Sequence, residues 1–208
     1  MKALLSTTYF GPVQWYQKLN RAEIAFIECH DSYRKQTYRN RCVIATTNGL
    51  QSLTIPVERP DSGLHSTLMK DLRISDHGNW RHLHWHALMS AYSESPFFEY
   101  YADDIRPFYE KKWDFLYDFN MEACQTVCSL LDIRPDIRPT SEYNKTDSLP
   151  EDVVDFRETI DPKHPEPDAD FVPRRYYQVF ERKTGFLPNL SILDLLFNMG
   201  PEGIFYLD

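Results

Sequence analysis

The first 29 residues carry a strand–helix–strand pattern, which limits the possible folds more than any other feature of the sequence. Residues 2–8 and 23–29 are apolar runs, and residues 12–21 between them place apolar side chains at the i, i+3, i+4, i+7 spacing of a helix. Such a crossover is right-handed and leaves its two strands parallel. The pattern therefore predicts an α/β fold.

A hairpin follows this unit. Asn48-Gly49 lies between two β-rich runs, residues 38–46 and 50–57, and both residues accept the positive φ of a tight turn. We expect the hairpin to extend the N-terminal strands into a mixed sheet, and a short strand over residues 69–75 to follow.

The chain from residue 79 onward is mainly helical in character. Residues 79–131 predict three helices, and residues 190–201 predict a further helix that ends at a Gly-Pro pair. Residues 141–174 are acidic and rich in proline, so we expect a long exposed loop or a lid with little regular structure. We expect a single domain over residues 1–208, with a mixed-sheet part (1–78) and a helical part (79–208).

Charge and hydropathy exclude several classes of protein. The net charge of -8 argues against a general attraction to nucleic acid or anionic membranes, so an anionic ligand requires a local basic cluster. No run approaches the roughly 18 apolar residues of a membrane span, and the N-terminus lacks a long apolar signal core, which predicts a cytoplasmic protein. The four cysteines lack the spacing of a zinc site, so we expect reduced, buried thiols.

The turn between the first strand and the first helix is a candidate binding site. Gly11 and Pro12 place a helix N-terminus, with its unpaired N–H groups, at the carboxyl end of a strand. The candidate substrate-binding residues of this turn are Tyr9, Phe10, Gly11 and Gln14. The alternative is an ordinary strand-to-helix turn.

Arg34-Lys35 and Arg39-Asn40-Arg41 form a local cluster of four cations, which is unusual in this acidic chain. In strand geometry Arg39 and Arg41 share one face, about 7 Å apart, and Tyr38 and Asn40 share the other. Two guanidinium groups at this spacing suit a phosphate or a carboxylate, so these four residues are candidate substrate-binding residues. The alternative is the charged outer face of an edge strand.

Three histidines alternate near the start of the helical part. His82 and His86 share a helical face, but the spacing indicates no third ligand, so no metal site is predicted. His84 is a candidate general base, and the alternative is a packed, hydrogen-bonded histidine.

The last predicted helix has a polar stripe on an otherwise apolar surface. Ser191, Asp194 and Asn198 follow one another at i, i+3, i+7. Ser191 caps the helix in this interpretation, and it forms a candidate substrate-binding pair with Asn198. Asp194 is a candidate catalytic residue. The alternative is an internal hydrogen-bond network, because buried polar groups need partners.

Short motifs are spread over nearly the whole chain. They are TYFGPVQW at residues 8–15, QTYRNR at 36–41, LTIPV at 53–57, PFF at 96–98, DFR at 155–157, YQVF at 177–180 and NLSILDLLFNMGP at 189–201. Together these motifs resemble the WbqC-like protein family. The resemblance implies a bacterial, cytoplasmic protein of surface-polysaccharide (O-antigen type) biosynthesis.

The resemblance further implies transfer of an acyl or aminoacyl group to the nitrogen of an activated amino sugar. Arg39 and Arg41 would then hold a phosphate, and residues 11–14 a second anion or a carbonyl oxygen. His84 or Asp194 would take the proton. The implied partner is a small molecule, a nucleotide sugar or an activated acyl donor, with no cofactor, nucleic acid or membrane insertion.

The alternative is a non-catalytic protein of polysaccharide assembly that binds a sugar nucleotide or a partner enzyme. Convergence of the candidate residues on one cleft favours an enzyme, whereas scattering favours the binding protein.

Overall fold

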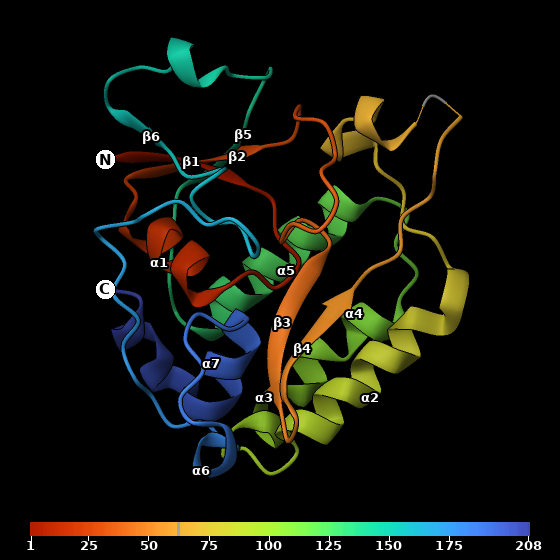
Figure 1. Cartoon of the computed structure of the whole chain (residues 1–208), viewed down its shortest axis with the longest axis vertical. Helices are drawn as coiled ribbons and strands as arrows, with labels where there is room; N and C mark the ends of the chain where they lie inside the picture. Colours follow the sequence, from red (N-terminus) through yellow and green to blue (C-terminus); the bar gives the residue numbers. More distant parts are fainter. Residues whose placement is uncertain (62) are drawn as a thin grey trace.

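The computed structural model describes residues 1–61 and 63–208. It contains a four-stranded parallel sheet in the order β5-β2-β1-β6 (Figure 1). The strands are β1 (Lys2–Ser6), β2 (Ile24–Glu28), β5 (Ile137–Pro139) and β6 (Val153–Asp155).

Helix α1 (Val13–Arg21) joins β1 to β2, so the predicted strand–helix–strand unit is confirmed. The apolar positions that predicted this helix, Trp15, Tyr16 and Leu19, are all buried. Because the two strands that flank the helix are parallel, their carboxyl ends lie at the same edge of the sheet.

The predicted hairpin forms β3 (Arg41–Thr46) and β4 (Gly49–Thr54), but these strands make a separate two-stranded antiparallel sheet. Helices α2 (Trp80–Tyr92) and α7 (Ile192–Met199) both pack against β3, and the backbone N–H of Ser191 donates to the carbonyl oxygen of Val43. The hairpin is therefore held by helices and does not extend the parallel sheet (Figure 1).

Four helices occupy the region in which three were predicted. They are α2 (Trp80–Tyr92), α3 (Phe98–Ile105), α4 (Pro107–Glu110) and α5 (Leu116–Leu130). A short α6 (Glu181–Thr184) and the buried α7 (Ile192–Met199) follow. Short 3-10 helices cover Leu64–Ser66, Met69–Asp71, His77–Asn79, Thr146–Ser148 and Gly200–Tyr206.

The predicted strand over residues 69–75 was wrong, because the segment begins as the Met69–Asp71 3-10 helix, and Arg73 and Ile74 form only isolated bridges. Residues 141–174 have little regular structure, as predicted, but the short strand β6 lies within them and pairs with β1. Strand β6 has only three residues, so its pairing with β1 specifies it more strongly than its own sequence does.

The mixed α/β fold class is confirmed, with its helices concentrated in the C-terminal half. The four cysteines are free and buried, as predicted. In the part of the chain that the structure describes, no helix is both long enough and apolar enough to cross a membrane.

Candidate functional site

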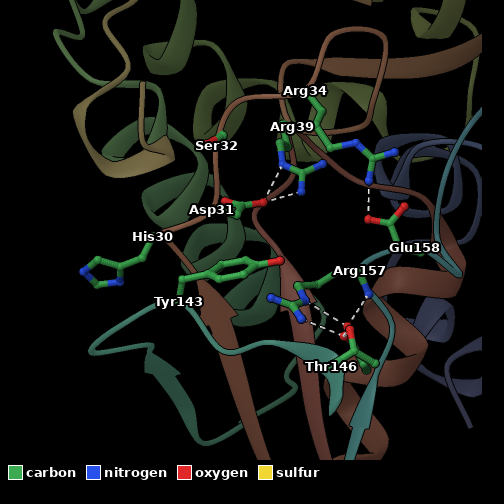
Figure 2. A pocket seen from close by; sticks show the side chains of 10 residues that line it. His30, Asp31, Ser32, Arg34, Arg39, Tyr143, Thr146, Arg157 and Glu158 are labelled. Atoms are coloured by element: carbon green, nitrogen blue, oxygen red, sulfur yellow. Dashed lines mark hydrogen bonds and ion pairs between the residues drawn. The ribbon is translucent and has the colours of Figure 1, made fainter. Parts of the chain in front are cut away.

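A cavity of about 510 Å³ lies at the carboxyl edge of the parallel sheet. Ten residues line it, and Figure 2 shows their side chains gathered around one space: His30, Asp31, Ser32, Arg34, Arg39, Tyr143, Thr146, Asp155, Arg157 and Glu158. This edge is where open α/β sheets commonly bind ligands. The cavity is therefore the candidate functional site.

The sheet positions these residues through its strand ends. Strand β2 ends at Glu28, and His30, Asp31 and Ser32 follow it directly. Strand β6 ends at Asp155 and leads into residues 157–158. The remaining residues come from the connection between β2 and β3 and from that between β5 and β6. Three separate segments, residues 30–39, 143–146 and 155–158, therefore meet in one cavity.

An ion pair fixes the floor of the cavity. Glu28, which is fully buried, accepts hydrogen bonds from Arg157 Nη1 at 3.0 Å, Thr140 Oγ1 at 2.8 Å and the backbone N–H of His30 at 2.9 Å. Arg157 also donates to Asp155 from Nε at 2.9 Å and Nη2 at 2.7 Å. Burial acts to raise the pKa of Asp155, but hydrogen bonds from Arg157 lower it overall.

A second pair, Asp31 and Arg39, lies on the cavity wall. Arg39 is almost fully buried and donates to Asp31 Oδ2 from Nε at 3.1 Å and also from Nη2. Burial raises the pKa of Asp31 above its ordinary value, although Arg39 opposes this, and nearby Glu28 raises it further. The second oxygen, Asp31 Oδ1, is buried and has no hydrogen-bond partner among the described residues. Asp31 therefore keeps an acceptor site for a ligand donor.

An aromatic ring and an exposed ion pair complete the cavity. The Tyr143 ring lies 5.2 Å from the Arg157 guanidinium carbon, and its side chain is exposed. Arg34 and Glu158 form an ion pair near the solvent (Figure 2). Carboxylates and guanidinium groups bind sugar hydroxyls and phosphates, and an aromatic face packs against a sugar or a base. The site therefore suits a polar ligand with hydroxyl or phosphate groups.

Two arginines of the predicted cation cluster, Arg34 and Arg39, line this cavity. Arg41 lies outside it and donates to Thr54 Oγ1 at 3.3 Å in an exposed contact. The expected shared face does not form, because residues 38–40 form a turn and β3 begins only at Arg41. Asn40 donates to the carbonyl oxygen of Ile55 at 2.8 Å, which ties this turn to the end of the hairpin.

Tyr38 lies beside Arg39 on the wall of a smaller, neighbouring cavity. Its ring is half-buried, and burial raises the pKa of the Tyr38 phenol to about 12, with smaller contributions from Asp161 and Cys42. The phenol is therefore neutral at pH 7 and able to donate a hydrogen bond.

The turn before α1 is buried, and its helix N-terminus already has partners. The N–H of Val13 donates to the carbonyl oxygen of Leu190 at 3.0 Å, and that of Gln14 donates to Asn189 Oδ1 at 2.9 Å. The Gln14 side chain donates to Asp168 Oδ2 at 2.8 Å. A helix begins directly after Pro12, as predicted, but the chain itself satisfies these donors.

Tyr9 and Phe10 lie in the aromatic core rather than on the 510 Å³ cavity. The Tyr9 hydroxyl is 2.9 Å from His84 Nδ1 and 2.8 Å from the Tyr109 hydroxyl. Burial lowers the pKa of His84 to about 4, with a smaller opposing effect from the Thr54 backbone. His84 is therefore a neutral, hydrogen-bonded core residue at pH 7.

His82 and His86 share a face of α2, as predicted, with ring centroids 4.0 Å apart. They line a separate open pocket with Trp85 and Tyr109. Across residues 1–61 and 63–208, no group of three or more His, Cys, Asp or Glu side chains is arranged to hold a metal ion.

The polar stripe of α7 forms an internal network. Ser191 caps the helix by accepting from the N–H of Leu193 at 3.3 Å. Asp194 is fully buried and accepts from the Tyr92 and Tyr176 hydroxyls, each at 2.7 Å, and from Gln178 Nε2 at 3.2 Å. These three donors are all uncharged.

Burial raises the pKa of Asp194 to about 6, although these hydrogen bonds oppose the shift. Asn198 continues the stripe and donates to the backbone oxygen of Asp194 at 2.8 Å. None of the three stripe residues lines the 510 Å³ cavity, so the network belongs to the core.

Sequence patterns did not identify most of the residues that line or support the cavity. Asp31, Tyr143 and Arg157 line it, and Glu28 pairs with Arg157 beneath it. A signal was present for some of them, because Glu28, His30 and Asp31 stand at the end of a predicted parallel strand. In such sheets polar residues after a strand lie at the ligand-binding edge. Arg157 lay in the DFR motif at residues 155–157, but no strand end pointed to it, since β6 was not predicted.

Comparison with known proteins gives a family but no solved structure. The WbqC-like protein family matches residues 7–164. "Uncharacterized protein Rv1507c" of Mycobacterium tuberculosis (strain ATCC 25618 / H37Rv) is 29% identical over 195 residues, covering 84% of this chain and 83% of that protein. No solved structure matches the chain. The match spans most of the sequence and includes every strand except β1, so the chain belongs to the WbqC-like protein family.

Proposed function

We propose that this protein acts in surface-polysaccharide biosynthesis by binding an activated amino sugar in the 510 Å³ cavity and transferring an acyl or aminoacyl group to its nitrogen. The observation that carries the proposal is Asp31, a buried carboxylate on the cavity wall with one unpartnered oxygen. A carboxylate with spare acceptor capacity suits an amine, which has protons to donate.

The chemistry requires a base and a fixed orientation of the nucleophile. The ammonium form of the amine gives one proton to Asp31, and the nitrogen lone pair that this frees attacks the carbonyl carbon of an activated acyl donor such as a thioester. The C–S bond then breaks, and the thiolate leaves with its electron pair and takes the second proton from the nitrogen, so that an amide and a thiol remain. A pKa raised by burial makes Asp31 a better base than an ordinary aspartate.

The arginines have positioning roles in this proposal. Arg39 holds one oxygen of Asp31 and so orients the other, while Arg34 and its partner Glu158 are exposed at the same cavity. Tyr143 supplies the aromatic face for a sugar or a base. His84 and Asp194, which were predicted to take the proton, have partners within the core, and Asp31 takes that role here.

A non-catalytic sugar-nucleotide-binding protein of polysaccharide assembly is the second candidate. It is favoured by the scatter of the predicted residues, since Gly11, His84 and Asp194 lie in the core and Arg39 lies at the cavity. Both candidates use the same cavity and differ only in whether a bond is made there.

Calorimetric titration with UDP-glucosamine, UDP-N-acetylglucosamine and UDP tests the binding. We expect UDP-glucosamine to bind and Asp31→Asn to weaken it about tenfold or more, because a charge-assisted hydrogen bond is lost. Asp132→Asn is the matched control, since Asp132 is exposed, lies outside the cavity and has a positive φ that asparagine tolerates. Equal affinity of the wild type and Asp31→Asn would contradict the proposal.

Mass spectrometry then separates the two candidates. The protein is incubated with UDP-glucosamine and a panel of acyl and aminoacyl thioesters and adenylates. An N-acylated product that Asp31→Asn does not form supports the transferase, whereas binding without any product supports the binding protein.

A further inference from the structure

A second, much smaller cavity lies next to the first, at the carboxyl end of β1. Its volume is about 10 Å³, which is room for a single oxygen atom or water molecule. Ser6, Thr7 and Thr8 line it at the end of the strand, and Arg39 lies on the walls of both cavities. We call this space the hydroxyl pocket.

The hydroxyl pocket has unused hydrogen-bonding capacity. The Oγ atoms of Ser6, Thr7 and Thr8 are buried, and none has a hydrogen-bond partner among the described residues. Thr7 is 1% exposed and Thr8 is 5% exposed, so solvent does not supply the partner. Burying an unpaired hydroxyl costs stability, and three such groups around one space point to a ligand atom there.

The turn after β1 holds these hydroxyls in place. Phe10 adopts a positive φ of 39°, and a Cβ atom on Gly11 would lie 2.8 Å from Thr8 Cβ. The N–H of Tyr9 donates to the carbonyl oxygen of Tyr38 at 2.9 Å and fixes the turn against the opposite wall. The absence of a side chain at Gly11 therefore provides the space that Thr8 occupies.

We propose that the hydroxyl pocket is an oxyanion site that takes the carbonyl oxygen of the transferred acyl group. This inference rests on the function proposed above. When the amine attacks, the carbonyl oxygen gains negative charge, and donors held ready in a dry site stabilise that charge. Thr7 and Thr8 supply the hydroxyl donors, and the volume of the pocket fits one oxygen. Arg39 lies on the wall of this pocket and donates a hydrogen bond to Asp31, the residue that receives the proton.

Phe156 and Ile160 form the outer wall of the hydroxyl pocket, and both are buried in the hydrophobic core. The N–H of Phe156 donates to the carbonyl oxygen of Leu4 at 2.9 Å, and the neighbouring Arg157 pairs with Glu28 and Asp155. This wall is therefore firmly held. Arg39 lies on the walls of both cavities, so a ligand oxygen would enter the hydroxyl pocket from the larger cavity.

A matched pair of ligands tests the proposal. UDP-N-acetylglucosamine carries the acyl carbonyl oxygen and UDP-glucosamine does not. In the double variant Thr7→Val, Thr8→Val, we expect about tenfold weaker binding of the N-acetyl ligand and less than about a threefold change for the amine ligand. Thr184→Val, which removes a hydroxyl that donates to the Phe180 carbonyl oxygen outside both cavities, is expected to change neither.

The thermal midpoint of the double variant provides a second readout. Removing unpaired hydroxyls leaves the midpoint unchanged or raises it, and a fall of several degrees would show that the hydroxyls are structural and overturn the proposal. Binding of both ligands with equal loss, or no loss, in the variant also overturns it.

If neither nucleotide sugar binds the wild type, the proposed function fails and the pocket is tested separately by a crystal soaked in acetamide. Acetamide oxygen within hydrogen-bonding distance of the Thr7 and Thr8 hydroxyls supports the subsite. A water molecule alone in the pocket overturns it.

Discussion

The core network around α7 and the cavity at the sheet edge both bury charged groups, but they complete their hydrogen bonds differently. In the core, both carboxylate oxygens of Asp194 accept side-chain hydrogen bonds, and His84 is bonded to Tyr9. In the cavity, Asp31 has one oxygen bound by Arg39 and one without a partner among the described residues. Burial of a polar group therefore does not mark a site, whereas unused hydrogen-bonding capacity beside a cavity does.

The largest expected effect is in the core. Asp194→Ala leaves the hydroxyls of Tyr92 and Tyr176 and the amide of Gln178 without their acceptor, and it also opens a void. We expect a loss of about 4 kcal/mol in the free energy of unfolding. Urea denaturation measures this loss, and a loss below 1 kcal/mol would show that Asp194 does not stabilise the core.

The next prediction concerns how stability depends on pH. Two core groups, Asp194 and His84, contribute to this dependence in opposite directions. The folded pKa of Asp194 is raised to about 6 from 3.8, so stability falls as pH rises from about 4 to 6. The folded pKa of His84 is lowered to about 4 from 6.5, so stability rises as pH rises from about 4 to 6.5. Each contribution is roughly 3 kcal/mol, and in the wild type they largely cancel.

Single variants expose the two pH contributions. Relative to the wild type, the stability of Asp194→Asn is expected to rise with pH between 4 and 6, because only the His84 contribution is left. The stability of His84→Gln is expected to fall over the same range. Urea denaturation at several pH values measures both slopes, and parallel curves for all three proteins would refute the assignment.

A smaller loss of stability is expected at the cavity than in the core. Arg39→Met leaves Asp31 without its cation, and we expect a loss of about 2 kcal/mol. This is less than for a fully enclosed pair, because the cavity admits water. Arg41→Met is the matched control and is expected to change stability by less than about 0.5 kcal/mol, since Arg41 makes only an exposed contact. UDP-glucosamine binding, followed by thermal shift, should be lost only in Arg39→Met.

The smallest effect is at the cavity rim. Glu158→Gln removes an ion pair in which both side chains are about half exposed, so stability is expected to change by less than about 0.5 kcal/mol. A loss above 2 kcal/mol in urea denaturation would mean that the rim is held as firmly as the core.

Much of the fold follows from local sequence patterns. The spacing of Trp15, Tyr16 and Leu19 predicted α1, and Asn48-Gly49 predicted the hairpin, because both features act within a few residues. Strands β5 and β6 were missed because each has only three residues and depends on β2 or β1 for its hydrogen bonds. Of the predicted site residues, Arg39 alone lines the 510 Å³ cavity.

Local sequence patterns were enough to predict the parallel strand–helix–strand start, the hairpin, the buried last helix and the family, which the comparison then confirmed. Which buried polar groups have hydrogen-bond partners depends instead on the three-dimensional fold. Asp194 accepts a hydrogen bond from Tyr92, which is 102 positions away in the sequence, and Arg157 donates one to Glu28, which is 129 positions away. Local spacing carries no information about partners at such separations, since chain folding alone brings them within hydrogen-bonding distance. In the same fold, one oxygen of Asp31 and the hydroxyls of Thr7 and Thr8 have no hydrogen-bond partner among the described residues, and all three residues line a cavity.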